Sequence, residues 1–88
     1  MISIISGDAP DRCFICGRRP DHVHHMLHGA MRKQADRYGL TCHLCHKCHA
    51  MLHDRGVKDR ELQIIAQREF EGKYGHDEYM RIFGKSYV

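Results

Sequence analysis

The spacing of hydrophobic residues predicts helices in the second half of the chain. Between residues 59 and 74 the apolar side chains recur every three or four positions, which is the period of one helical face. This largely apolar stripe consists of Leu62, Ile65, Ala66, Glu69, Phe70 and Tyr74. We expect a core-facing helix there, a short helix over residues 77–83, and an earlier helix beginning at Cys48 and including His53.

Alternation of apolar and polar residues predicts a half-buried strand over residues 40–45. Leu40, Cys42 and Leu44 share its apolar face, so we expect Cys42 to be a small core residue rather than a ligand. A second strand is expected over residues 22–27, ended by Gly29. Residues 30–38 favour a helix, with Gly39 placed as its C-cap.

The first eleven residues form an N-terminal segment ahead of a single domain over residues 12–88. Met1 to Ser6 is either a short β segment or a poorly ordered start, and Gly7 to Asp11 is rich in turn formers. The predicted fold is therefore a small α+β domain with C-terminal helices. A chain of 88 residues rarely buries enough apolar area to be stable without an additional cross-link, such as a bound metal ion.

Two Cys-x-x-Cys pairs can provide that cross-link. Each pair offers two thiolates to a soft cation from one tight turn, and the pairs lie about thirty residues apart, as in four-cysteine zinc sites. Gly17 follows the first pair and can take the positive φ that such a turn needs. We predict a structural Zn²⁺ held by Cys13, Cys16, Cys45 and Cys48.

Four histidines form a second constellation. His49 and His53 are four residues apart and share one face of the predicted helix, the geometry by which a helix presents two imidazoles to a metal. Successive helical residues differ by about 100° in direction, so Cys48 and His49 should serve different ions. One histidine of the adjacent pair His24-His25 would complete an open three-imidazole site, and such open sites are usually catalytic rather than structural.

Neighbouring residues on a strand point to opposite faces, so only one of His24 and His25 should bind the metal. The other is free to abstract a proton, because histidine has an ordinary pKa near about 6.5. His46 is an alternative ligand if the helix begins early. A purely structural role for the histidines, in the core or on a second structural zinc, is the other interpretation.

Positive charge is concentrated between Arg12 and Arg37, where six basic residues face two acidic ones and leave an excess of +4. Such a distribution suits a polyanionic partner, whose phosphates bind largely independently of sequence. We expect Arg32, Lys33 and Arg37 to contact phosphates, the alternative being a solvated helix face.

The cysteine usage indicates a reducing compartment. Five is an odd number, four of the cysteines lie in close pairs, and no secretory signal precedes them. No apolar run approaches the roughly 20 residues that span a bilayer, so no membrane association is expected. The expected location is the cytoplasm, that of a bacterial host if the chain is encoded by a phage or prophage.

These motifs resemble the HNH endonucleases, the ββα-metal form of the treble-clef fold, and most closely the small members common in phage and prophage genomes. The resemblance covers about residues 12–88. It rests first on the Cys-x-x-Cys pair (Cys13 to Cys16) and on the His-His pair with a glycine soon after (His24 to Gly29). A basic segment ending in Tyr-Gly (Arg32 to Gly39) and a Leu-Cys-x-x-Cys-His motif (Leu44 to His49) follow. A Phe-Gly-x-x-Tyr tail (Phe83 to Tyr87) is weaker evidence.

The resemblance implies that His24, His49 and His53 hold the catalytic metal and that His25 is the general base. It implies cleavage of DNA phosphodiester bonds with one divalent ion, Mg²⁺, Mn²⁺, Ni²⁺ or Zn²⁺. Of these, three imidazoles suit Zn²⁺, Ni²⁺ or Mn²⁺. Nine residues before His49, where many members carry an orienting asparagine, this chain has Leu40. His43 or a backbone carbonyl would then orient His25.

The predicted function is thus a metal-dependent HNH-type endonuclease acting on DNA. The alternative is a non-catalytic zinc-finger module of phage origin that binds DNA or another protein through the same basic face. A homodimer or a phage-protein partner is also compatible with the sequence, since one HNH site nicks one strand and a dimer would provide a second.

Overall fold

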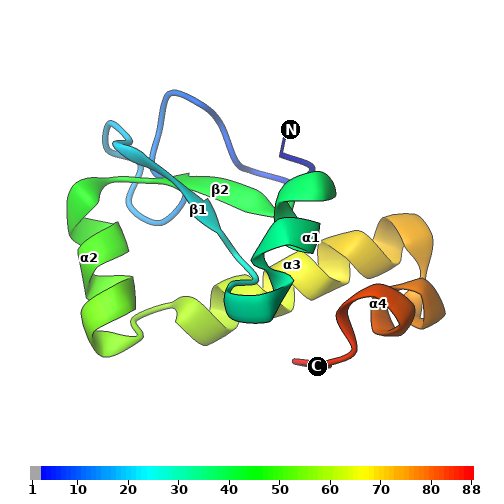
Figure 1. The fold of residues 1–88 in the computed structure, drawn as a ribbon. Helices are drawn as coiled ribbons and strands as arrows, with labels where there is room; N and C mark the ends of the chain where they lie inside the picture. The colour runs from blue at the N-terminus through cyan, green and yellow to red at the C-terminus, as the bar shows by residue number, and fades with distance from the viewer. Residues whose placement is uncertain (1–2) are drawn as a thin grey trace.

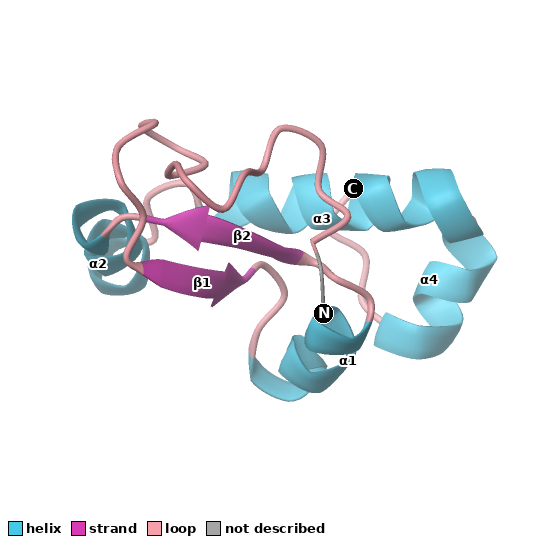
Figure 2. Ribbon diagram, turned by 90° about the horizontal axis from the view of Figure 1, so that it is seen from above, coloured by secondary structure: helices cyan, strands magenta, loops and turns pink. Residues whose placement is uncertain are grey.

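The centre of the molecule is a two-stranded antiparallel hairpin (Figure 1). The structure, a computed structural model, describes residues 3–88. Strand β1 (His22–His25) pairs with β2 (Thr41–Leu44), with His24 opposite Cys42 and His25 opposite Thr41. The chain enters α2 directly from β2 and leaves β1 towards α1, so the two helices lie near opposite ends of the hairpin (Figure 2).

The segment between the strands departs from the predicted boundaries. Strand β1 ends at His25 because the next residues turn inward: Met26 and Leu27 are fully buried, and the Met26 N–H donates to the Leu40 carbonyl at 3.0 Å. The predicted helix is divided into a 3-10 turn, η1 (Gly29–Met31), and a short helix, α1 (Arg32–Arg37). Gly39 has a φ of 72° just after that helix, as its predicted capping role requires.

Helix α2 (His46–Arg55) begins two residues before the predicted start. Cys45 is its N-cap, and its Sγ accepts the Cys48 N–H at 3.4 Å. The Asp21 carboxylate accepts the N–H of His46 at 2.8 Å. Two backbone donors that a helix start leaves unpaired are therefore satisfied from outside the helix, which explains the earlier start.

Helix α3 (Asp59–Tyr74) has the predicted bounds, and α4 (His76–Phe83) begins one residue before the predicted position. Leu62, Ala66 and Phe70 of the predicted stripe are buried, whereas Tyr74 at its end is 44% exposed. Gly75, with a φ of 94°, separates the helices, and α4 folds back beside α3 (Figure 1).

The C-terminal tail is fastened to α3 by a buried glutamine. The Gln67 side chain is fully buried, donates to Ser86 Oγ at 3.0 Å and accepts the Tyr87 N–H at 2.6 Å. The Tyr79 hydroxyl donates to the Lys85 carbonyl at 2.7 Å. These three hydrogen bonds attach the tail to α3 and α4, so the C-terminal helices and tail close the core.

The N-terminal segment packs along β2. The Ile4 N–H donates to the Gly39 carbonyl at 3.0 Å, Ile5 is buried, and the Asp8 carboxylate accepts the His43 N–H at 2.9 Å. No strand forms between Ser3 and Ser6, while Met1 and Ile2, also part of the segment considered as β, lie outside the described residues. This cover buries Thr41 as well as the apolar face of β2, so the strand is more enclosed than its alternating pattern predicts.

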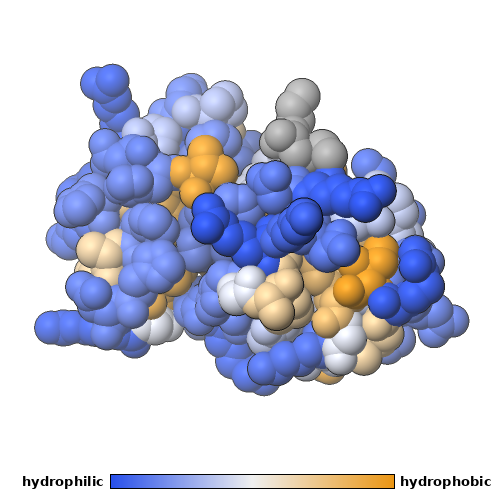
Figure 3. All heavy atoms as spheres, viewed as in Figure 1, coloured by the Kyte–Doolittle hydropathy of each residue, from blue (hydrophilic) through white to orange (hydrophobic). Residues whose placement is uncertain are grey.

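No helix within residues 3–88 combines the length and the apolar character needed to cross a membrane. The face seen in Figure 3 is mainly hydrophilic, with smaller hydrophobic areas between the polar groups.

Candidate metal centres

The four paired cysteines converge on one point. The Sγ atoms of Cys13, Cys16, Cys45 and Cys48 all lie within 4.8 Å of one another. Cys16 Sγ and Cys45 Sγ, from different pairs, are 3.6 Å apart. Four thiolates at about 2.3 Å from a tetrahedral zinc ion would be about 3.8 Å from one another, so the cluster could hold zinc with little movement.

Backbone hydrogen bonds shape the first cysteine pair. The Cys13 N–H donates to the Arg18 carbonyl at 2.6 Å, and the Gly17 N–H donates to the Cys13 carbonyl at 2.9 Å. Gly17 has a φ of 79°, which glycine adopts without the strain a side chain would add. The Phe14 N–H donates to the His43 carbonyl at 2.7 Å, so this turn is attached to β2 beside the second pair.

The thiols differ in acidity. Burial by itself raises the pKa of Cys13, but backbone N–H groups nearby, those of Cys16 and Cys45 first, lower it to about 6. Burial and hydrogen bonds to the neighbouring cysteines raise the pKa of Cys48. Thiolates are the metal-binding form, and this lowered pKa favours the thiolate form of Cys13 at neutral pH. Cys42 lies outside this cluster, and burial raises its pKa to about 12.

Three histidines form a second convergent cluster. The ring nitrogens of His24, His49 and His53 lie within 4.8 Å of one another. His49 and His53 are on successive turns of α2, and their Nε2 atoms are 3.0 Å apart. Two imidazoles at 2.0–2.1 Å from one tetrahedral ion would be about 3.3 Å apart, so these rings are already near ligand spacing.

His24 gives the strongest indication that this cluster binds a metal ion. It is 3% exposed, and its Nε2 is the one buried side-chain nitrogen or oxygen within residues 3–88 that has no hydrogen-bond partner. A buried nitrogen without a partner costs free energy, and a metal ion between the three rings would satisfy it. Burial, then repulsion from His49 and His53, lowers the His24 pKa to about 4, which keeps its ring in the neutral, metal-binding form.

His25 opens onto the same hollow as this histidine triad. The hollow has a volume of about 380 Å³ and is lined by Val23, His24, His25, His28, Gly29, Arg32, His49 and His53. A second hollow is lined by His25, Gly29, Ala30, Arg32, Lys33 and Asp36. His25 and Arg32 line both hollows. An imidazole and a guanidinium group therefore line the same hollow as the triad.

Of the other candidate residues, some lie beside the triad and others do not. Arg32 and Lys33 line the hollow beside His25, whereas the Arg37 guanidinium lies 5.9 Å from the Tyr38 ring centroid and lines neither hollow. His46 is exposed and outside the triad, with its ring 5.8 Å from that of His22. The alternative in which His46 replaces His49 or His53 has no support in this geometry.

Two aspartates near the triad were not among the predicted site residues. His25 Nε2 lies 3.0 Å from Asp36 Oδ1, and His28 Nε2 lies 3.1 Å from Asp59 Oδ1. His43, one of the two candidates for orienting His25, instead pairs with Asp8 at 2.9 Å. Eleven and thirty-one residues separate the members of the first two pairs, so only the folded arrangement of β1, α1 and α3 brings them together.

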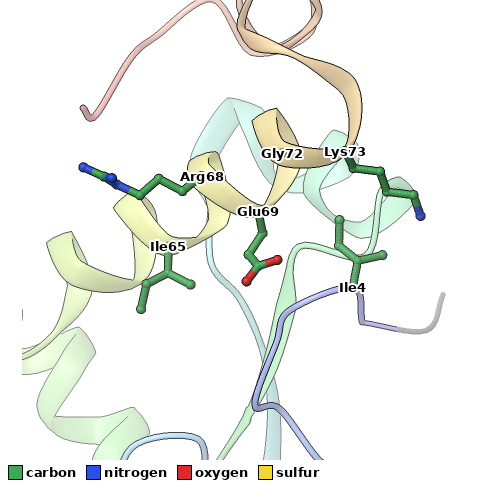
Figure 4. Close-up of a pocket in the computed structure, with 6 residues that line it drawn as sticks. All are labelled: Ile4, Ile65, Arg68, Glu69, Gly72 and Lys73. Carbon is green, nitrogen blue, oxygen red and sulfur yellow. The ribbon is translucent and has the colours of Figure 1, made fainter.

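A hollow with a larger volume than the two beside His25 lies elsewhere and has different chemistry. Its volume is about 840 Å³, and it lies between α3 and the N-terminal segment, lined by Ile4, Ile65, Arg68, Glu69, Gly72 and Lys73. Figure 4 shows that Arg68 and Lys73 extend from α3 in opposite directions. Neither cluster of potential metal ligands borders it, so size alone does not identify the functional site.

No family model matches this chain, and no curated protein or solved structure matches it either.

Proposed function

We propose that this protein is a metal-dependent endonuclease of the HNH type that hydrolyses DNA phosphodiester bonds. The observation that carries the proposal is the shared hollow: His25, which is not part of the triad, opens onto the same space as His24, His49 and His53. An open three-imidazole site could hold a Lewis-acidic ion beside a further imidazole that could act as a base, and both groups promote hydrolysis of a phosphodiester.

A ββα-metal, treble-clef fold is part of the same proposal. The antiparallel hairpin followed by α2 fits a ββα-metal, treble-clef arrangement. In it one cysteine pair lies on the turn before β1 and the other at the start of α2. Cys45 caps α2 and is also a candidate zinc ligand, so a structural zinc would fix the start of the helix that carries His49 and His53.

His25 is the proposed general base. It removes a proton from water: the O–H bond breaks, an N–H bond forms on the ring, and the electron pair left on oxygen attacks the phosphorus. The bond to the 3′ oxygen then breaks, and that oxygen leaves with its electron pair. A divalent ion held by His24, His49 and His53 would supply positive charge to stabilise the charge developing on the phosphate and the leaving oxygen.

Arg32 and Lys33 are the proposed phosphate contacts. Both are exposed and line the hollow beside His25, and Arg32 also borders the triad. Cationic side chains there would position the DNA backbone without reading its bases. Arg37 is less suited to this role, because its guanidinium lies near the ring of Tyr38.

A nicking assay tests the proposal. Supercoiled plasmid is incubated with the wild-type protein and with His25→Ala in Mg²⁺, Mn²⁺, Ni²⁺ or Zn²⁺, and the metal content of both proteins is measured. We expect the wild type to nick the plasmid with at least one ion. His25→Ala should lose cleavage while keeping the same metal content and circular dichroism spectrum.

Full cleavage by His25→Ala would refute the assignment of the base. If the wild type binds DNA without nicking it under any of these ions, the zinc-finger module that only binds DNA becomes the better description.

A further inference from the structure

The contact between His25 and Asp36 joins two different elements at the edge of the candidate site. His25 is the last residue of β1, and Asp36 lies in the last turn of α1. Their Nε2 and Oδ1 atoms are 3.0 Å apart, and the His25 side chain is 17% exposed. The Asp36 carbonyl also accepts N–H groups just after the helix, including that of Gly39 at 3.3 Å, so the helix end fixes the aspartate backbone.

The chemistry of the two groups determines which ring nitrogen is protonated. An ionised carboxylate only accepts hydrogen bonds, so a neutral His25 must carry its proton on Nε2, the nitrogen facing Asp36. The remaining nitrogen, Nδ1, then has a free electron pair. The hydrogen bond to His25 is the main cause that lowers the pKa of Asp36, so this carboxyl is ionised at neutral pH.

We propose that Asp36 is a positioning residue that holds His25 in the tautomer protonated on Nε2, so that Nδ1 takes the proton from the attacking water. This inference rests on the proposed nuclease function. Once Nδ1 is protonated, the carboxylate stabilises the resulting imidazolium and remains unprotonated itself.

The His43 side chain, the candidate that the sequence also offered for this role, is engaged elsewhere. His43 pairs through its Nδ1 with Asp8 at 2.9 Å. Leu40 has no polar side-chain atom, is fully buried, and its N–H donates to the Ala35 carbonyl at 2.8 Å. Within residues 3–88, Asp36 is the hydrogen-bond partner that the structure gives to the His25 ring.

Nitrogen NMR of the zinc-loaded protein with ¹⁵N-labelled histidine tests the tautomer directly, with the His25 signals assigned by their absence from His25→Ala. We expect wild-type His25 to be protonated on Nε2. Asp36→Ala should give a mixture of the two tautomers, and Asp36→Glu, which restores a carboxylate, should recover part of the wild-type signal.

Cleavage and binding are measured on the same proteins. Asp36→Ala should lower the single-turnover rate at saturating protein by about tenfold or more, a part of the roughly 10²- to 10⁴-fold that a general base contributes. DNA binding should not weaken, because the substitution removes a negative charge beside Arg32. Asp59→Asn is the matched control, since it changes an aspartate that pairs with another histidine of the same hollow, and its rate should stay near that of the wild type.

Two results would overturn the inference: wild-type His25 protonated on Nδ1, or an Asp36→Ala protein that cleaves at the wild-type rate. If the wild type cuts no DNA but its Nε2–H tautomer is lost in Asp36→Ala, the nuclease proposal fails while the positioning contact stands. The spectra and the rates therefore separate the two claims.

Discussion

Cys48 and His49 are neighbours in the first turns of α2, yet they belong to different clusters. The Cys48 Sγ lies with three other sulfurs, and His49 lies with His24 and His53. Adjacent positions on a helix point about 100° apart, so the same two turns serve both clusters. The cluster that could hold a structural zinc and the open histidine triad therefore both include residues of one helix, α2.

Metal content should show two separable sites. We expect about two bound metal ions per chain by elemental analysis after incubation with Zn²⁺. His49→Ala should keep one, because it removes a member of the triad and leaves the four cysteines intact. His46→Ala is the matched control and should keep both ions, since His46 lies outside the triad. Equal losses in the two variants would contradict the assigned ligands.

The cysteine site should support the fold, and the histidine site should not. Structural zinc contributes on the order of 10 kcal/mol to folding in small domains, so Cys16→Ser should strongly lower the thermal unfolding temperature in circular dichroism. His53→Ala should change that temperature little, because His53 is exposed. An unchanged unfolding temperature for Cys16→Ser would show that the fold does not depend on a metal there.

Acid should destabilise the protein through His24 when the triad holds no ion. Its pKa is about 4 in the folded protein, lowered first by burial, against about 6.5 when unfolded. Below the unfolded value the unfolded chain binds the extra proton, so stability is complete above about pH 6.5 and falls as the pH drops towards 4. The loss attributable to this group is at most about 3 kcal/mol.

The measurement is thermal unfolding between pH 7 and 5, with zinc kept on the cysteines and the triad emptied. His24→Gln cannot titrate, so its stability should depend less on pH than that of the wild type. Parallel curves for the two proteins would show that His24 does not have the lowered pKa.

Arg32 and Arg37 should differ in their effects on DNA binding. Removing one phosphate contact reduces the slope of log K against log salt by about 1, so Arg32→Ala should weaken binding and show this smaller slope. Arg37→Ala should have less effect, because Arg37 lines neither hollow and lies beside Tyr38. Fluorescence anisotropy at several salt concentrations measures both. Equal losses would indicate diffuse attraction rather than a contact at the site.

The helices of this fold are predictable from local sequence, and their exact ends are less so. The apolar stripe of α3 has a strong period, and Gly75 and Gly84 mark the ends of α3 and α4, with positive φ at both. The early start of α2 depends on Asp21, which is 25 residues before His46 and captures its N–H. The burial of Thr41 similarly depends on a cover from the N-terminal segment, which strand alternation does not reveal.

Most members of the metal-ligand clusters are predictable because their spacing is local: each cysteine pair lies on one turn, and His49 and His53 lie on one helical face. Asp36 and Asp59 could not be found in this way. Each meets its histidine across the fold, and an aspartate on a helix has no distinctive sequence spacing to its partner. For Asp36 the available signal was its place in the helix that follows the His-His motif, and this becomes informative once α1 is placed against β1.

The most direct test of the central claim is to measure plasmid nicking while metal is returned to protein that retains only the cysteine-bound zinc. The account predicts no nicking at the start and a rate that rises to saturation as one further ion binds per chain. His49→Ala, treated identically, should show no rise. Cleavage by protein holding only the cysteine zinc, or no cleavage once the triad is filled, would contradict the account.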